Sequence, residues 1–399
     1  FKLMSKLKKN NLFIKINNDK FLIAVGKYDD ELNFKIIEKE TINQVIYKNK
    51  KIENLDLVVN NFKKKINDIE KKLNVFFSDV NIIISKSDVD CINVSGFKKL
   101  NGNQILSEDI SYILNDVKLK LSESEKDKTI IHLFNTKYIL DNKILKNLPI
   151  GLYGDFYSHQ LTFFMVEDKE IENLKTIFNK CNLNLNKVIL KSFTEGIKTI
   201  KKYREDTFVE IIIYKEETHI VFFYESAFCF YQKFNFGSEI ILKDISKICS
   251  LEILIIRNII SDLNYEKLSQ DIYLDEKYFE KKNFKKISHQ YLKEIASARI
   301  EEIANIIFNQ NKNLNNFQLK KTNLYLNLED KNIGLKFKDV FENNFKEFTL
   351  NFDSSKDDNT YTSLEIFGEL LSKGWAKEAI PVINKKKSWI TRVFSGLFE

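Results

Sequence analysis

Pro149-Ile150-Gly151-Leu152-Tyr153-Gly154, followed by an apolar run at 161–166, is the segment most informative about the architecture. Its proline and two glycines predict a turn that leads into a strand. The residues before it predict a helix from Ser107 to about Lys120, with two acids in its first turn. They also predict strands at 80–85, 90–95 and 129–134. These patterns predict a small α+β unit inserted in a larger one.

On both sides of this unit the sequence alternates between strands and helices. Before it, strands are predicted at 12–25 and 32–39, and an amphipathic helix at 61–73 has Phe62, Ile66, Ile69 and Leu73 on one face. After it, helices are predicted at 171–180, from residue 240, at 287–309 and at 363–371. Strands are predicted at 209–214, 219–224, 228–234 and 324–326. Strand hairpins thus open each half, which predicts a mixed α/β protein.

The composition predicts a folded protein with more than one core. The chain has 399 residues, 43% of them hydrophobic, and 33 phenylalanines. No run reaches the ~18 uncharged apolar residues of a spanning helix. The basic start is not followed by the apolar region of a secretory signal. The four cysteines lack CxxC spacing, which predicts reduced residues in a cytosolic protein.

Charge and motif searches exclude several function classes. The net charge of +7 is spread along the chain, which argues against a dedicated nucleic-acid groove. The four histidines have no metal-ligand spacing, so we predict no metal site and expect surface or hydrogen-bonded core imidazoles. There is no GxSxG elbow and no catalytic cysteine signature, so we predict no catalytic residue.

The C-terminal segment, 385–399, has the chemistry of a helix lying on an anionic membrane. Its large apolar residues share one helical stripe and its basic residues lie beside them. The apolar residues are Trp389, Ile390, Val393, Phe394, Leu397 and Phe398, and the basic ones are Lys385, Lys386, Lys387 and Arg392. We predict a reversible membrane anchor, and the alternative is a terminal helix packed on its own domain.

The order and spacing of these elements resemble the FtsA family of bacterial cell division proteins. His132, Tyr138, Asp141 and the 149–154 segment are similar to that family's subdomain 1C. Phe236-Gly237-Ser238 and Lys243-Asp244-Ile245 are similar to the start of its subdomain 2B, and Arg299-Ile300-Glu301-Glu302 resembles an Arg-x-Glu-Glu motif on a later helix. The tail takes the place of the family's membrane-targeting helix.

The resemblance implies an actin/Hsp70-like two-lobed fold of mixed α/β class, with an inserted α+β subdomain and a C-terminal amphipathic helix. Subdomain 1A is assigned to 1–79 and 167–205, and the inserted 1C to 80–166. Subdomain 2A begins at 206–237, 2B covers 238–312, and 313–372 completes 2A and returns to 1A. A linker at 373–384 then leads to the membrane helix at 385–399.

ATPases of this fold hold phosphates between two hairpin loops, whose glycines let backbone N–H groups approach and whose carboxylates organise Mg²⁺. Aligned on Gly26, the first family motif falls on 15–20, where only Ile16 and Lys20 agree with it. The second falls on 212–218, where Ile212 replaces the aspartate and three glycines become Tyr214, Lys215 and Glu216.

The other nucleotide positions also depart from the family. The adenosine-side glycine pair falls on Asn327-Leu328, and the glutamate that accompanies Arg257 becomes Leu254. We therefore predict a degenerate nucleotide site, no enzymatic activity, and no ATP or Mg²⁺ cofactor. If nucleotide binds, the candidate contacts are Lys20, Gly26, Gly237 and Arg257.

The resemblance further implies the partners. Subdomain 2B would bind the C-terminal tail of the tubulin-like FtsZ, and 1C would support self-assembly into protofilaments. The tail would bind anionic lipids at the cytoplasmic face of the bacterial inner membrane, at the division site, beside other division proteins. The alternatives are an active ATPase of the actin fold and an FtsA-like component of a pilus or secretion platform.

Overall fold

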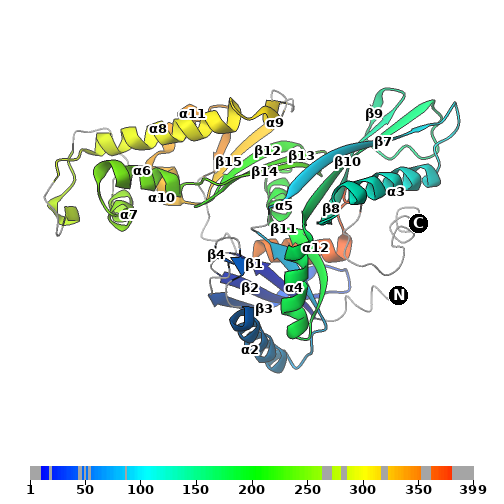
Figure 1. The fold of residues 1–399 in the computed structure, drawn as a ribbon, viewed down its shortest axis with the longest axis horizontal. Helices are drawn as coiled ribbons and strands as arrows, with labels where there is room; N and C mark the ends of the chain where they lie inside the picture. The colour runs from blue at the N-terminus through cyan, green and yellow to red at the C-terminus, as the bar shows by residue number, and fades with distance from the viewer. Residues whose placement is uncertain are drawn as a thin grey trace. The chain divides into compact units, whose positions relative to one another are not determined.

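The computed structural model describes residues 10–17, 20–43, 47–48, 51–52, 55–85, 88–262, 272–279, 285–315, 322–351 and 361–379. The chain forms two compact units (Figure 1). Unit 1 comprises the described residues within 1–206, 223–231 and 359–399, and unit 2 those within 207–222 and 232–358. The predicted membrane segment at 385–399 lies outside the described residues. Among those that are described, no helix is long and apolar enough to cross a membrane.

Unit 1 is built on a five-stranded sheet in the order β11-β6-β1-β2-β3. Its strands are β1 (Asn11–Ile16), β2 (Lys20–Tyr28), β3 (Phe34–Asn43), β6 (Asp79–Ile84) and β11 (Asn184–Leu190). β1, β6 and β11 run parallel, and β1-β2-β3 form an antiparallel meander. The nearly continuous apolar runs of β1 and β6 suit strands covered on both faces, and both strands are almost wholly buried.

Helices cover both faces of this sheet. On one face, α2 (Leu55–Leu73) and α4 (Asp168–Lys180) pack through Phe62, whose ring lies 4.4 Å from that of Phe21 and 5.3 Å from that of Phe178. On the other, α12 (Thr362–Lys373) and α5 (Lys191–Tyr203) are packed together, and the ring of Phe367 lies 5.4 Å from that of Phe13. The helix predicted at 61–73 is confirmed, although it begins at Leu55.

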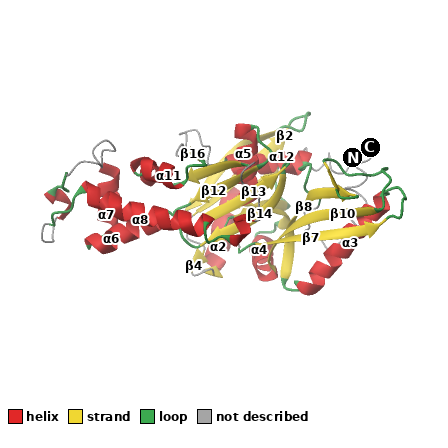
Figure 2. Ribbon diagram, turned by 90° about the horizontal axis from the view of Figure 1, so that it is seen from above, coloured by secondary structure: helices red, strands yellow, loops and turns green. Residues whose placement is uncertain are grey.

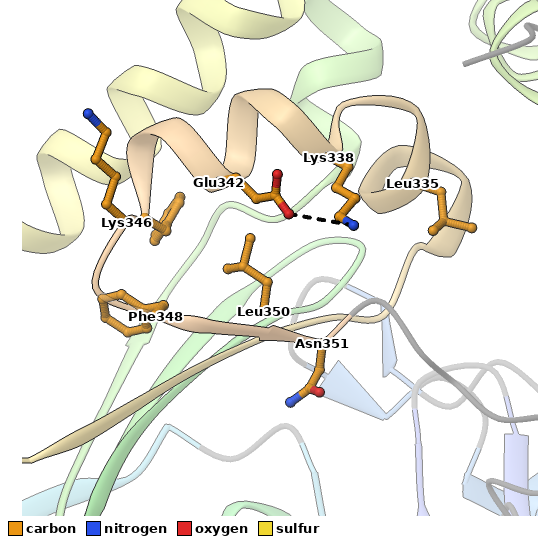
Figure 3. Close-up of a pocket in the computed structure, with 8 residues that line it drawn as sticks. Leu335, Lys338, Glu342, Lys346, Phe348, Leu350 and Asn351 are labelled. Atoms are coloured by element: carbon orange, nitrogen blue, oxygen red, sulfur yellow. Dashed lines mark ion pairs between the residues drawn. The ribbon is translucent and has the colours of Figure 1, made fainter. Parts of the chain in front are cut away.

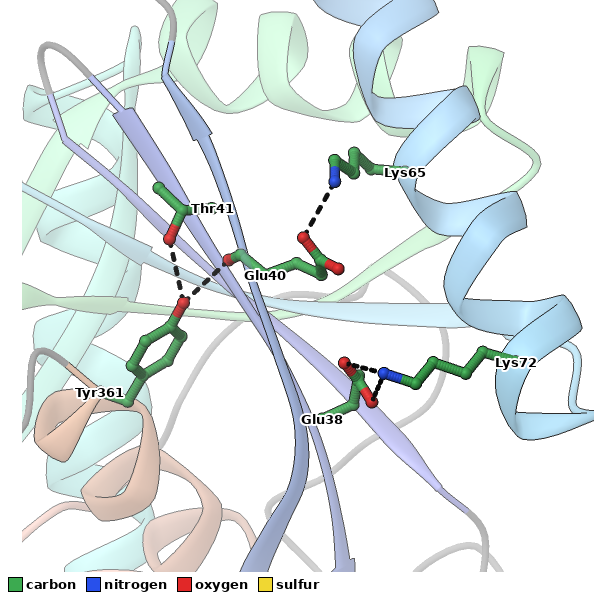
Figure 4. Close-up of polar contacts among 6 residues, drawn as sticks. All are labelled: Glu38, Glu40, Thr41, Lys65, Lys72 and Tyr361. Carbon is green, nitrogen blue, oxygen red and sulfur yellow. Dashed lines mark hydrogen bonds and ion pairs between the residues drawn. The ribbon is translucent and has the colours of Figure 1, made fainter.

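Polar contacts join β3 to the helices on both sides (Figure 4). Lys65 and Lys72 of α2 reach Glu40 and Glu38, at 2.9 and 2.8 Å. Tyr361, at the start of α12, donates its hydroxyl to the Glu40 carbonyl oxygen at 3.0 Å. These ion pairs are partly exposed, so each contributes at most about 1 kcal/mol. Beyond β3, a short hairpin contains β4 (Tyr47–Lys48) and β5 (Lys51–Ile52).

A second sheet of unit 1 has the order β7-β10-β8-β9 and is wholly antiparallel. Its strands are β7 (Asp90–Lys99), β8 (Lys128–Leu140), β9 (Lys143–Leu145) and β10 (Phe156–Glu167), and α3 (Ser107–Ser124) lies along one face (Figure 2). This is the predicted α+β insertion. Its predicted start at residue 80 needs correction, because β6 is a buried strand of the first sheet and the inserted sheet begins with β7.

Unit 2 contains a five-stranded sheet in the order β14-β13-β12-β15-β16. Its strands are β12 (Phe208–Ile213), β13 (Thr218–Tyr224), β14 (Ala227–Phe234), β15 (Asn323–Leu328) and β16 (Thr349–Asn351). The helices are α6 (Glu239–Cys249), α7 (Ile253–Asp262), α8 (His289–Phe308), α9 (Lys312–Asn315), α10 (Lys331–Lys336) and α11 (Lys338–Asn344), with a 3-10 turn, η2, at Glu276–Phe279. The tip of the β13–β14 hairpin, 223–231, belongs to unit 1.

Candidate functional site

The first candidate phosphate loop is the β1–β2 hairpin of unit 1. Lys20 is the first residue of β2, and the Asn17 N–H donates to its carbonyl oxygen at 3.0 Å. Gly26 lies further along β2, where a Cβ atom would come within 2.0 Å of the Phe34 ring. The same ring lies against Gly368 of α12, where a Cβ would approach it to 2.2 Å. A packing role for Gly26 is therefore established, whereas its predicted contact with nucleotide remains a prediction.

The second candidate loop is the turn between β12 and β13. The Tyr214 N–H donates to the Glu217 carbonyl oxygen at 2.9 Å, which closes the turn. The carbonyl oxygens of Tyr214 and Lys215 accept the N–H groups of Ser238 and Glu239, at 2.8 and 2.9 Å. These donors belong to the N-terminal end of α6, where an anion would otherwise find backbone N–H groups. The turn itself thus takes the place of a phosphate at this helix end.

Side chains reinforce this arrangement of the second loop. Ile212, at the position aligned with the family's aspartate, is buried. Glu216 is exposed, and the Glu217 carboxylate lies 3.1 Å from Nε2 of the buried His219. Two carboxylates on such a turn oppose the approach of a polyanion.

Gly237 and Arg257, two of the predicted nucleotide residues, lie beside this turn within unit 2. A Cβ on Gly237 would come within 2.3 Å of the Tyr214 carbonyl oxygen and 2.7 Å of the Glu217 nitrogen, so the turn's backbone requires a glycine there. Arg257 of α7 forms an ion pair with Glu239 in the first turn of α6. The structure therefore brings these two residues to the same helix end, where both already have intramolecular roles.

The adenosine-side positions are occupied by side chains. Asn327, at the end of β15, donates its amide to the buried carboxylate of Glu210 on the neighbouring strand β12. Leu328 is buried beside it. Asp330 then caps α10 by accepting the Ile333 N–H at 3.2 Å. This end of the strand lacks the close backbone approach that a glycine pair provides.

A groove between α6 and α8 is the second candidate site. It has a volume of about 540 Å³ and is lined by Asp244, Lys247, Ile248, Ile295, Ala298, Arg299 and Glu302. Arg299 donates to the carboxylates of Asp244 and Glu302, and its ion pair with Asp244 raises the pKa of the guanidinium. Ile248 is 51% exposed at the groove, whereas Ile245 and Ile300 are buried beneath it. The two motifs flagged in the sequence, 243–245 and 299–302, therefore meet here.

A second concavity of about 460 Å³ lies over α11 and β16 (Figure 3). Its lining includes Phe345, Phe348 and Lys346, and an ion pair of 3.5 Å joins Lys338 to Glu342. This lining offers no catalytic arrangement. In the described part of the chain, no group of three or more His, Cys, Asp or Glu residues is placed to hold a metal ion.

A buried charge cluster in unit 1 was not predicted. His132 of β8 is fully buried, and its Nε2 accepts the Leu190 N–H at 3.0 Å. The proton is therefore on Nδ1, which donates to the Glu378 carboxylate at 2.6 Å. Lys187 lies 3.9 Å from the same carboxylate. Burial alone would raise the pKa of Glu378, but Lys187 and His132 outweigh it and hold the pKa below its ordinary value.

This cluster fixes the residues that follow α12. The Ala379 N–H donates to the Leu133 carbonyl oxygen at 2.7 Å, and the Asn135 N–H donates to that of Lys377 at 2.9 Å. Trp375 Nε1 donates to the Ser226 carbonyl oxygen at 2.7 Å. Residues 375–379 were predicted as linker, but they are packed on β8 because Glu378 finds a buried partner there. His132 and His159 are hydrogen-bonded core imidazoles, as predicted, and burial lowers the pKa of His159 to about 3.

The sequence was compared with those of known protein families and curated proteins. No family model matches the chain. The cell division protein FtsA of Buchnera aphidicola subsp. Acyrthosiphon pisum (strain APS) is 22% identical over 194 residues, which are 49% of this chain and 46% of that protein. The match thus spans less than half the length of this curated relative.

One solved structure has a similar fold over most of the chain. The structure titled PilM-PilN type IV pilus biogenesis complex aligns with a TM-score of 0.51 and 9% identity, over 92% of this chain and 96% of that one. MreB5 of Spiroplasma citri bound to AMPPNP aligns with a TM-score of 0.47 and 9% identity, over 91% and 96% of the two chains.

The chain is similar to an FtsA over about half of its length. Its fold is actin-like and of mixed α/β class, as predicted from the sequence. Asp244 and Arg299 were flagged as parts of FtsA-like motifs, but the groove in which they meet was not predicted. The Glu378 cluster was missed because the sequence offers only an isolated glutamate after a helix.

Proposed function

We propose that this FtsA-like protein is a cell division scaffold that links FtsZ filaments to the cytoplasmic face of the bacterial inner membrane. The likeness to an FtsA over 194 residues supports the division role, and the α6–α8 groove supports a peptide-binding role. In this proposal, the protein acts by joining partners and has no catalytic step. Self-assembly and contacts with other division proteins belong to the same proposal.

The α6–α8 groove supports this function through its mixed lining. Ile248 is an exposed apolar side chain on a helix, and in the same groove Arg299 donates to the carboxylates of Asp244 and Glu302. A short peptide with one apolar anchor and charged flanks fits such a groove, because the anchor is desolvated and the charges fix its register. The C-terminal tail of FtsZ is the peptide we propose.

Peptide binding can be tested by fluorescence anisotropy with a labelled FtsZ C-terminal peptide. Ile248→Asp should lower the affinity at least about tenfold, because it removes an apolar contact and places a charge in the groove. The matched control is Leu254→Asp on α7, since Leu254 is 68% exposed and does not line the groove. Equal affinity for both variants would reject the groove as the binding site.

The membrane link in this proposal is the basic, apolar segment at 385–399. Replacing Trp389 and Phe394 with Glu should release the protein from anionic vesicles, because both lie on the apolar stripe. A thermal melt of the variant matching that of the parent would show that the globular units remain folded. Full retention on vesicles would refute the anchor.

We also propose that the nucleotide site is degenerate. The support is the turn at 214–217, whose carbonyl oxygens already take the N–H groups of Ser238 and Glu239. Titration with ATP and Mg²⁺ should therefore leave the melting temperature unchanged. A saturable upward shift would instead favour the alternative of an active ATPase of the same fold.

A second candidate is an FtsA-like component of a pilus platform. It is supported by the structural likeness to the PilM-PilN complex over 92% of this chain. The two proposals predict different peptide partners for the groove. Binding of the α6–α8 groove to a peptide from a membrane-embedded pilus protein, with none to the FtsZ peptide, would favour the pilus role.

A further inference from the structure

The second sheet of unit 1 has one face covered by α3. Its other face is exposed at the end of the sheet that contains Phe97 and Phe156, which we call the outer end. A Cβ on Gly96 of β7 would come within 2.3 Å of Ile113, so the even-numbered side of β7 faces α3. Phe97, the next residue, must therefore point to the opposite face, because side chains alternate along a strand. It is 67% exposed.

On this opposite face, side-chain exposure increases from Phe164 back to Phe156 of β10. Phe164 is fully buried, and its ring is stacked on that of Phe228 at 4.2 Å. Gln160 and Ser158, on the same face, are half-buried. Phe156, at the outer end, is 45% exposed. The β13–β14 hairpin tip thus covers the inner half of this face and leaves the outer half open among the described residues.

Apolar residues from all four strands lie on the open half. Phe97 is opposite Ser158, Ser158 is opposite Ile139, and Ile139 is opposite Ile144. The ring of Phe156 stacks on that of Phe97, with centroids 5.7 Å apart and planes at 24°. We call Phe97, Ile139, Ile144 and Phe156 the outer face. Ile144 is 59% exposed, so the row continues to the sheet edge.

The charged residues that pair across strands within the outer-face rows are basic. Lys99 is opposite Phe156 on the neighbouring strand, and Lys137 is opposite Gln160 in the adjacent row. The three cross-strand rows that contain these residues have no acid. Asp141 at the nearby turn accepts the N–H groups of Asp155 and Phe156, at 2.9 and 2.8 Å. Exposed aromatic and aliphatic residues with lysines beside them suit an anionic lipid surface.

The position of Ala379 limits how far this sheet can lie from a membrane that holds the proposed anchor. Ala379 is hydrogen-bonded to Leu133 of β8. Five residues, 380–384, separate it from Lys385, where the proposed anchor begins. The six Cα–Cα steps from Ala379 to Lys385 span at most about 22 Å. A lipid-bound anchor would therefore hold Leu133 of β8 within about 25 Å of the headgroups.

We propose that the outer face is a second contact with an anionic lipid surface, and this inference rests on the proposed membrane anchor. Two weak contacts on one body bind cooperatively, because the second binding step is effectively intramolecular. The geometry also sets the orientation of the second sheet toward the bilayer. Docking of the chain's own C-terminal segment on this face is disfavoured, since both carry lysines.

The test uses the full chain and vesicles of phosphatidylglycerol and phosphatidylethanolamine in equal amounts. The double variant Phe97→Ser, Ile144→Ser should bind these vesicles about tenfold more weakly, with an unchanged melting temperature, because both side chains are largely exposed. The control Tyr112→Ser, Leu119→Ser alters equally exposed residues of α3, on the covered side, and should bind like the parent. Equal binding by the double variant and the parent would overturn the proposal.

A second measurement separates lipid contact from contact between copies. In a Trp389→Phe background, a tryptophan placed by Phe97→Trp should be quenched by vesicles with brominated acyl chains. Absence of quenching, or an altered sedimentation coefficient of the double variant without vesicles, would assign the face to self-association and overturn the proposal. Trp389→Glu, Phe394→Glu tests the anchor separately. If that variant binds like the parent while Phe97→Trp is quenched, the proposed anchor fails and the outer face stands.

Discussion

Replacing Glu378 with Gln should destabilise unit 1 strongly, because the glutamate is a buried charge with a buried partner. Its side chain and that of Lys187 are 3% and 11% exposed. At their separation of 3.9 Å, and an effective dielectric constant of about 20, the attraction is about 4 kcal/mol. The amide oxygen of Gln can still accept the His132 Nδ1–H, so the substitution isolates the charge. Lys187 is then left buried without compensation, and the expected loss is about 3 kcal/mol.

Urea unfolding monitored by Trp375 fluorescence can measure this loss, since Trp375 is hydrogen-bonded within the same unit. A Trp389→Phe background leaves Trp375 as the only tryptophan. With an m-value of about 2 kcal/mol/M, the midpoint should fall by about 1.5 M. The control is Glu369→Gln, whose ion pair with Lys201 is about half exposed and should contribute under about 1 kcal/mol. Equal midpoints for the two variants would refute the buried-cluster account.

Three further predictions follow from the same structure. The stability difference between the parent and Glu378→Gln should be constant at neutral pH and shrink as pH falls below about 4. The reason is that the folded pKa of Glu378 lies below its unfolded value of about 4.3. Urea midpoints across pH would show the decrease, and a difference as large at pH 3 as at pH 7 would contradict it. Gly237→Ala should cost about 2–3 kcal/mol, because its Cβ would meet backbone atoms of the 214–217 turn; chemical denaturation monitored by far-UV circular dichroism would measure this, and a neutral result would exclude the tight turn. Gly368→Ala should cost about 1–3 kcal/mol against the Phe34 ring, and Phe34→Leu should recover part of it; additive effects in the double-mutant cycle would contradict that contact.

The hydrophobic pattern was enough to predict the elements with a clear period. Phe62, Ile66 and Ile69 are buried on α2 as the 3.6-residue period requires. The start of α2 was missed, although Asn54 is a suitable capping residue and Val58 and Val59 are buried with Phe62. β6 was assigned to the wrong sheet, since strand composition does not reveal which strands pair.

The candidate sites were predictable only where a local motif marks them. Asp244 and Arg299 could be flagged from short motifs, although their ion pair joins residues 55 positions apart. The partner of Glu378 is 246 residues away in the sequence, and no periodic signal connects them. Gly237 was noted as a possible nucleotide contact, but its packing against the 214–217 turn depends on a tertiary approach.

The proposed linking role is tested most directly by co-flotation of purified FtsZ with anionic vesicles. We expect FtsZ to float only when this protein is present, and to remain at the bottom when the protein carries either Ile248→Asp or the pair Trp389→Glu, Phe394→Glu. If the unaltered protein floats but leaves FtsZ at the bottom, or if FtsZ floats with both variants, the proposed link is contradicted.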